Sequence, residues 1–224
     1  MIKSFLILTT FTISLIYAKQ IVLVVANDIN SSTAKLKCFE DGKKKFDTID
    51  VNIGKNGLGW GIGLKEINHN YNIIKKYEGD KKAPLGIFKL TTIFGYKYKS
   101  EYNLPYLYTS KNLICVDDSN SLFYNNIIEA HGDEKSFEHM RRKDNLYQLG
   151  IVVQHNKNQL KRRGSCIFLH LQRGKNSPTV GCTSMSYTDL KKIAKWLKKA
   201  QTPILIQITK KELNEVFKLY PELK

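Results

Sequence analysis

Two residues in the C-terminal part of the chain have side chains suited to acyl-transfer chemistry. Cys182 follows Gly181 in the segment TVGCTSM, and His170 ends the apolar segment CIFLH twelve residues earlier. The thiolate is the reactive form of cysteine, and an adjacent imidazole can accept the thiol proton. The pair predicts a cysteine nucleophile with a histidine base, on condition that the intervening loop folds back. The spacing alone also fits a buried cysteine and a structural histidine.

The neighbours of Cys182 are candidates for stabilising a negatively charged intermediate. Gly181 lets the backbone approach a substrate closely, so N–H groups near Cys182 are expected to stabilise an oxyanion. Thr179 and Thr183 flank these positions in the sequence and are further candidates for substrate contact. We therefore expect the substrate to bind around this short segment.

Short apolar runs predict the strands that position these residues. They lie at Ile21–Ala26, Gly86–Leu90, Leu149–Val153, Cys166–Leu169 and Ile204–Ile208. Such runs are typical of buried strands. Two further extended segments, at about 35–40 and 46–53, flank Asp41-Gly42, a dipeptide that favours a tight hairpin turn.

Two capping boxes predict the helices. Ser186 precedes Asp189 by three residues, Thr209 precedes Glu212 by three, and apolar residues at helical spacing follow each pair. Residues 96–144 show no sustained period, and we interpret them as an elaborate loop region or an inserted subregion. The fold class is therefore mainly β with a few flanking helices.

Composition limits the class of protein. The 224 residues have 42% hydrophobic residues and a formal net charge of +16, which favours one globular domain over a disordered or fibrous chain. Only five of the 36 basic residues are arginine. Arginine forks dominate specific recognition of bases and phosphates, so this surplus of lysine argues against a nucleic-acid partner.

The N-terminus has the pattern of a secretory signal. Lys3 precedes an uncharged, mostly apolar stretch at 4–16, which ends at Tyr17-Ala18. We expect residues 1–18 to be a signal peptide, cleaved after Ala18, and residues 19–224 to work in the periplasm or cell envelope without stable membrane insertion. An uncleaved anchor stays open, because Ile16 is large for its position before the cleavage site.

The four cysteines would then lie where disulfides are permitted. If Cys182 stays a free thiol, Cys38, Cys115 and Cys166 allow at most one intramolecular bridge, and the sequence leaves the pairing open. Cys166 shares the strand face of His170 by alternation, and we interpret it as a core residue. A zinc site from His155, Cys166, His170 and Cys182 is disfavoured, because the paired ligand spacing of zinc frameworks is missing.

Several motifs together resemble one protein family. The most specific are GDKKAPLGIFKL at 79–90 and FLH followed by TVGCTSM within 168–185. Segments 53–61, 116–118, 140–156 and 164–170 add to the likeness, which covers nearly all of the chain after residue 18. In their order and combination they resemble the L,D-transpeptidase catalytic domain, also called the YkuD-like or ErfK/YbiS/YcfS/YnhG family.

The resemblance implies a β-sandwich-like single catalytic domain and a cysteine acyltransferase that acts on bacterial peptidoglycan. Cys182 would attack the carbonyl of the diamino acid at position three of a stem peptide, and His170 would carry the proton to the departing amine. An amine of a neighbouring stem would then resolve the thioester and form a cross-link. This chemistry implies no metal and no organic cofactor.

The sequence departs from the most familiar form of the family motif at two positions. Val180 stands where that motif has a second histidine, and Ser184 stands where it has an arginine. Three arginines are candidates to bind a substrate carboxylate instead: Arg141, Arg142 and Arg173. The group that orients His170 is not evident, and a backbone carbonyl near Leu171 would serve as well as a side chain.

Two other functions remain open at this stage. Water could resolve the thioester, which would make the protein an L,D-carboxypeptidase. Alternatively, the departures at Val180 and Ser184 could belong to a catalytically silent peptidoglycan-binding protein that keeps the fold.

Overall fold

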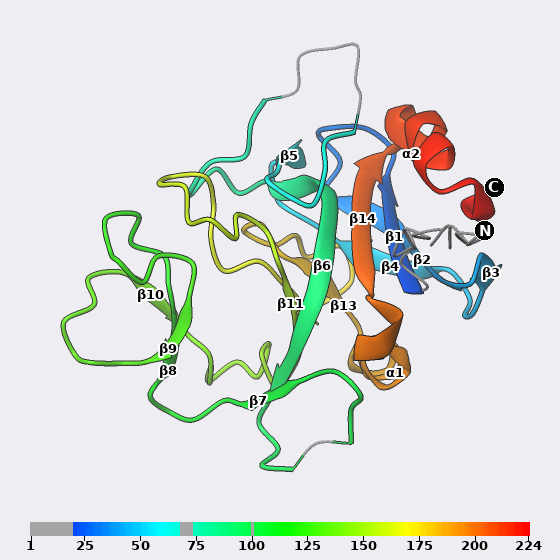
Figure 1. The fold of residues 1–224 in the computed structure, drawn as a ribbon. Coiled ribbons are helices and arrows are strands. Elements are labelled where there is room, and N and C mark those ends of the chain that lie inside the picture. The colour runs from blue at the N-terminus through cyan, green and yellow to red at the C-terminus, as the bar shows by residue number, and fades with distance from the viewer. Residues whose placement is uncertain (1–19, 68–73, 100) are drawn as a thin grey trace, which may run out of the picture.

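The computed structural model describes residues 20–67, 74–99 and 101–224. The expected signal peptide at 1–18 lies outside these residues. Most described elements are strands, and the few helices lie near the C-terminus (Figure 1). The strands are β1 Gln20–Ala26, β2 Thr33–Glu40, β3 Lys43–Lys44, β4 Ile49–Asn52, β5 Leu58–Trp60, β6 Ala83–Gly95, β7 Tyr106–Tyr108, β8 Leu113–Val116, β9 Ile127–Glu129, β10 Phe137–His139, β11 Leu149–Val153, β12 Phe168–Leu171, β13 Thr183–Met185 and β14 Ile204–Thr209. The helices are α1 Tyr187–Trp196 and α2 Leu213–Leu219, with 3-10 turns η1 Lys199–Gln201, η2 Lys210–Glu212 and η3 Pro221–Leu223.

The main sheet closes into a barrel. Its strands follow the order β1-β14-β6-β11-β12-β13-β4-β2, and β1 also pairs with β2. The mainly β class is confirmed, but the expected sandwich is replaced by a closed, mixed barrel of eight strands. The reason is that β1 is paired along both edges, parallel to β14 and antiparallel to β2, so neither edge stays open.

The predicted strands form with small changes of extent. Leu149–Val153 is β11 as predicted, whereas the predicted strand at Gly86–Leu90 is part of the longer β6, Ala83–Gly95. The turn at Asp41-Gly42 joins β2 to β3, with positive φ angles of 49° and 75° at the two residues. Those angles are the ones that a two-residue hairpin turn requires.

Both predicted helix starts are confirmed. The Ser186 hydroxyl accepts the Asp189 backbone N–H and caps α1. Thr209 and Glu212 form the reciprocal capping box that opens η2 and α2. Among the described residues, no helix has the length and apolar character needed to cross a lipid bilayer.

Residues 96–144 contain more regular structure than the sequence predicts. They include β7 and a second, three-stranded sheet in the order β10-β8-β9, which lies to one side of the barrel (Figure 1). A disulfide between Cys115 in β8 and Cys166, two residues before β12, ties this small sheet to the barrel. Its strands are too short for periodicity to reveal them, because each of β9 and β10 has only three residues.

Candidate active site

Cys182 and His170 lie on neighbouring strands of the barrel wall. β12 and β13 run parallel, with His170 opposite Ser184, and Cys182 directly precedes β13. The backbone N–H of Phe168 donates to Cys182 Sγ over 3.3 Å. Phe168 and His170 share one strand face by alternation. Cys182 also packs in one buried cluster with the Phe168 side chain, so the sulfur lies on the face of β12 that carries His170. The loop between the two candidates thus folds back as the sequence requires.

The His170 ring is held in one tautomer. Its Nδ1 lies 2.8 Å from the carbonyl oxygen of Leu171. A carbonyl only accepts, so Nδ1 carries the proton and the Nε2 lone pair is left to accept another. Burial lowers the pKa of His170 to about 4, against the opposing effect of the Leu171 carbonyl. The ring is therefore neutral at pH 7, as a general base must be.

Cys182 is a protonated thiol in this arrangement. It is 5% exposed, and its S–H points to the Cys166 carbonyl at 3.5 Å. Burial raises the pKa of the thiol to about 12. Because His170 is also neutral, the resting pair is a thiol and an imidazole, and proton transfer must accompany attack on a substrate.

An aromatic side chain that the sequence did not single out covers the pair. The Tyr147 ring packs edge-on against Phe168 and His170, at centroid distances of 5.5 Å and 5.3 Å. Its hydroxyl donates to Glu138 Oε2 over 2.5 Å. Tyr147 precedes β11 in the motif at 140–156, but nothing in its spacing indicates contact with the site. The segment from β10 to β11 therefore closes over the sulfur.

The candidate oxyanion donors differ in availability. The Gly181 N–H donates to Thr179 Oγ1 over 3.1 Å, and that hydroxyl donates to the Cys182 carbonyl over 2.6 Å. The Cys182 N–H has no acceptor among the described residues. Thr183 points elsewhere, since its hydroxyl donates to Gln207 Oε1 over 2.7 Å. Of the expected donors, the Cys182 N–H is thus the free one.

The three candidate arginines make different contacts. Arg141 donates to the carbonyls of Thr109 and Tyr96, over 2.7 and 3.1 Å, which is a structural use of its guanidinium. Arg142 forms a bidentate pair with Asp144, at 2.9 and 2.7 Å.

Arg173 is largely exposed, with a longer contact of 3.5 Å to Asp144. Asp144 therefore draws Arg142 and Arg173 together near His170, and Arg173 is the one of the three with its guanidinium most open to solvent. Their part in binding a carboxylate stays a prediction.

A zinc site at these residues does not fit the geometry. Cys166 is oxidised to a disulfide with Cys115, which corrects the interpretation of Cys166 as a simple core residue. Both ring nitrogens of His155 are occupied: Nδ1 accepts the Ile62 N–H at 3.2 Å, and Nε2 lies 2.9 Å from the Arg163 carbonyl. Two of the four conceivable ligands are thus committed to other bonds.

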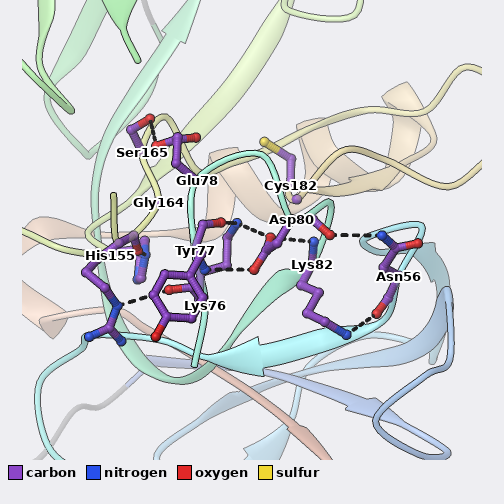
Figure 2. A network of polar contacts seen from close by, with 12 residues as sticks. Asn56, Lys76, Tyr77, Glu78, Asp80, Lys82, His155, Gly164, Ser165 and Cys182 are labelled. Atoms are coloured by element: carbon purple, nitrogen blue, oxygen red, sulfur yellow. Dashed lines mark hydrogen bonds and ion pairs between the residues drawn. The ribbon is translucent and has the colours of Figure 1, made fainter. Parts of the chain in front are cut away.

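Two hollows in the described part of the chain lie on either side of the β12–β13 region. One, of about 640 Å³, is a polar groove over β2, β4 and the start of α1, and Cys182 is not among the residues that line it. A smaller one of about 160 Å³ lies beside the disulfide and includes Phe168, whose backbone contacts Cys182. On its other side the Gly181-Cys182 backbone lies near a polar network on segment 74–82, which Figure 2 shows.

Comparison with known proteins agrees with this geometry. Residues 25–206 match the L,D-transpeptidase catalytic domain (YkuD) family. A solved structure of a variant of the helical cell shape determining protein Pgp2 from Campylobacter jejuni is similar at 17% identity and a TM-score of 0.39. That match covers 92% of this chain, which spans only 55% of the Pgp2 chain. No curated protein sequence matches. Because the family match extends over most of its length, the chain belongs to the L,D-transpeptidase catalytic domain (YkuD) family.

Proposed function

We propose that this protein is an exported cysteine L,D-transpeptidase that cross-links or remodels peptidoglycan through a thioester on Cys182. The observation that carries the proposal is the placement of His170 and Cys182 on adjacent strands, with His170 Nδ1 bound to the Leu171 carbonyl. That bond leaves Nε2 as the proton acceptor on the strand face beside the sulfur. Export rests on the signal-like residues 1–18, which the structure does not describe.

The first half-reaction is acylation. His170 Nε2 takes the proton from Cys182 Sγ as the sulfur attacks the carbonyl carbon of the donor residue in the stem peptide. The carbonyl oxygen becomes an oxyanion, to which the free Cys182 N–H can donate. The intermediate then collapses: the C–N bond breaks, the imidazolium returns its proton to the departing amine, and a thioester remains.

The second half-reaction determines the product. An amine from a neighbouring stem attacks the thioester carbonyl, His170 accepts its proton, and the thiol is regenerated as the new amide forms. If water attacks instead, the products are a shortened stem and the free thiol. L,D-carboxypeptidase activity is therefore the alternative that shares every residue of this site.

Substrate must displace part of the cover before it reaches the sulfur. The cover consists of Tyr147 and Met140, which pack in one buried cluster with Cys182. Tyr147 is anchored at its hydroxyl by Glu138, on β10 of the small sheet.

The burial of Cys182 also favours a second candidate function. A catalytically silent wall-binding protein needs no access to the sulfur, and Cys182 is only 5% exposed. The free Cys182 N–H and the single tautomer of His170 support the enzyme instead, because a silent protein has no need of either.

Intact-protein mass spectrometry with a tetrapeptide stem as donor tests the proposal. We expect an acyl adduct on the wild type and none on Cys182→Ala. Cys38→Ala is the matched control, since Cys38 is the other free, buried cysteine, and it should keep the adduct. An adduct on Cys182→Ala, or none on the wild type, contradicts the proposal. Product analysis then separates transfer from hydrolysis, because only transfer gives cross-linked dimers.

A further inference from the structure

A buried lysine lies beside the candidate nucleophile. Lys76 is 3% exposed, and its ammonium donates to Asp80 Oδ1 over 2.6 Å and to the Tyr77 carbonyl over 2.8 Å. An ammonium has three N–H groups, and the third has no acceptor among residues 20–67, 74–99 and 101–224. A buried cation that keeps an unused donor is costly, so this position is suited to receive negative charge from another source.

The ammonium is held firmly in place. Besides Lys76, the Asp80 carboxylate accepts the backbone N–H groups of Tyr77 and Lys82, at 2.7 and 2.8 Å (Figure 2). Arg163 Nε donates to the Lys76 carbonyl over 3.0 Å and fixes the backbone on the other side. A charge fixed before reaction stabilises a developing anion without the cost of reorganisation.

The ammonium faces the residue that precedes the nucleophile. A Cβ atom built at Gly181 would lie 3.9 Å from Lys76 Nζ, so the side-chain direction of this position points to the cation. In Figure 2 Cys182 lies above the Lys76–Asp80 pair, with its backbone end nearer the pair and its sulfur at the far end. Gly181 also has a φ of +150°, which other residues rarely adopt. The glycine thus keeps open the space between the ammonium and the Gly181-Cys182 backbone.

Two cations lie near Cys182, and they differ in burial. Besides burial, Glu138 raises the pKa of the thiol, whereas Lys76 and Arg142 lower it. Arg142 donates its Nε and one terminal nitrogen to Asp144, and its side chain is 31% exposed. The side chain of Lys76 is 3% exposed, so water screens its charge less. The remaining ionisable neighbours are Tyr147, whose hydroxyl is donated to Glu138, and the neutral His170.

We propose that the Lys76 ammonium supplies the positive charge that stabilises the Cys182 thiolate and the oxyanion during acylation. This inference rests on the proposed function. The Gly181 N–H already donates to Thr179 Oγ1, so the Lys76 ammonium would take its place in stabilising the oxyanion. Asp80 is the positioning residue: it holds the ammonium in place and partly neutralises its charge.

The test measures the rate at which iodoacetamide alkylates Cys182 at fixed pH values from 7 to 9, with the modified residue located by peptide mass mapping. This range lies below the pKa of the thiol, so the rate is proportional to the small fraction of thiolate. Lys76→Met keeps the length of the side chain and removes its charge, and should lower the rate about tenfold at each pH. Asp80→Asn leaves the ammonium without its counter-charge, so the rate should rise. Lys82→Met is the matched control, because that ammonium binds the Asn56 carbonyl over 2.6 Å on an exposed part of the same network.

The two opposite shifts separate an electrostatic role from a structural one. If Lys76 only supported the fold, Lys76→Met and Asp80→Asn would change the alkylation rate in the same direction, and that result overturns the inference. An unchanged rate in folded Lys76→Met also overturns it. If Lys76→Met does not fold, the Asp80→Asn rate decides, and a rate no higher than that of the wild type overturns the inference.

The same measurement distinguishes a failure of this inference from a failure of the proposed function. A wild-type sulfur that never reacts overturns the nucleophile itself. A reactive wild type whose alkylation rate is the same in Lys76→Met and Asp80→Asn overturns only the inference. In the acylation assay, Lys76→Met should lower kcat at least tenfold, with KM changed less, since the charge acts on the anion rather than on the ground state.

Discussion

The surroundings of Cys38 and of Cys182 differ in the chemistry that they allow. Both residues are free, both are buried, and burial raises the pKa of each thiol to about 12. Cys38 lies in β2 within the aliphatic core of the barrel. Cys182 instead accepts the Phe168 N–H at its sulfur and lies near the Lys76 charge and the His170 strand. Burial and pKa thus fail to separate the two cysteines, whereas their polar neighbours do.

The two buried histidines lead to the same conclusion. Burial lowers the pKa of His155 and of His170 to about 4. His155 uses both ring nitrogens on backbone groups, which is typical of a structural histidine. His170 uses only Nδ1, on Leu171, and keeps Nε2 for chemistry.

The largest expected effect comes from exchanging the two histidines for glutamine. His170→Gln should slow acylation of Cys182 by about a thousandfold, because the proton acceptor is lost. His155→Gln should instead lower the free energy of unfolding by about 1–3 kcal/mol, since two buried backbone partners lose their bonds. Acylation rates from mass spectrometry and urea unfolding measure the two effects. Equal rates in His170→Gln and wild type would remove His170 as the base.

The disulfide is a second difference between the surroundings of the two free cysteines. It joins the small sheet to the part of the barrel that holds Cys182, and it does not involve the strand that holds Cys38. Replacing both Cys115 and Cys166 by alanine opens a cross-link between residues separated by 51 positions. In the chain-entropy description this costs about 4 kcal/mol of stability. Urea unfolding of the double variant measures the loss. A loss below about 1 kcal/mol would mean that the small sheet is held by packing alone.

Acid should affect stability through both histidines. Their folded pKa of about 4 lies below the unfolded value of about 6.5, so the unfolded chain binds more protons between these pH values. Stability should therefore fall as pH drops from about 6.5 to 4, by up to about 3 kcal/mol for each histidine, and stay level above pH 7. Unfolding free energies at pH 4.5 and 7.5 test this, and His170→Gln should lose about half of the dependence. Equal dependence in both proteins would mean that His170 titrates normally.

Cys38→Ala should give the smallest effect. Loss of one buried sulfur among aliphatic side chains costs about 1 kcal/mol. Acylation should not change, because no part of the site contacts Cys38. A drop in the acylation rate of more than about threefold would show that packing at β2 affects the geometry of the site.

The strands could be predicted from sequence where one apolar run makes one strand. Ile21–Ala26 and Leu149–Val153 became β1 and β11 with at most one residue of difference. Closure of the barrel could not be predicted, because it depends on β1 pairing with β14, which lies at the other end of the chain. Local patterns contain no information on which distant edge a strand will meet.

The site was predictable only in part for a similar reason. His170 and Cys182 lie twelve residues apart, and their residue types alone suggest a base and a nucleophile. Tyr147 and Lys76 come from polar segments without a period, and only the folded chain brings Tyr147 to the His170 ring and Lys76 to Gly181. The bond between Cys115 and Cys166 was one of three possible pairings, and the tertiary structure selects it.

The Cys115–Cys166 disulfide has a consequence for how the Cys182 sulfur is held in position. Cys166 contributes its carbonyl to the Cys182 thiol, and its own sulfur anchors β8 of the neighbouring sheet. A single residue thus links the sulfur to the sheet that carries Glu138, the anchor of the Tyr147 cover. Reduction of this disulfide should therefore loosen both the Tyr147 cover and the contact between the Cys182 thiol and the Cys166 carbonyl.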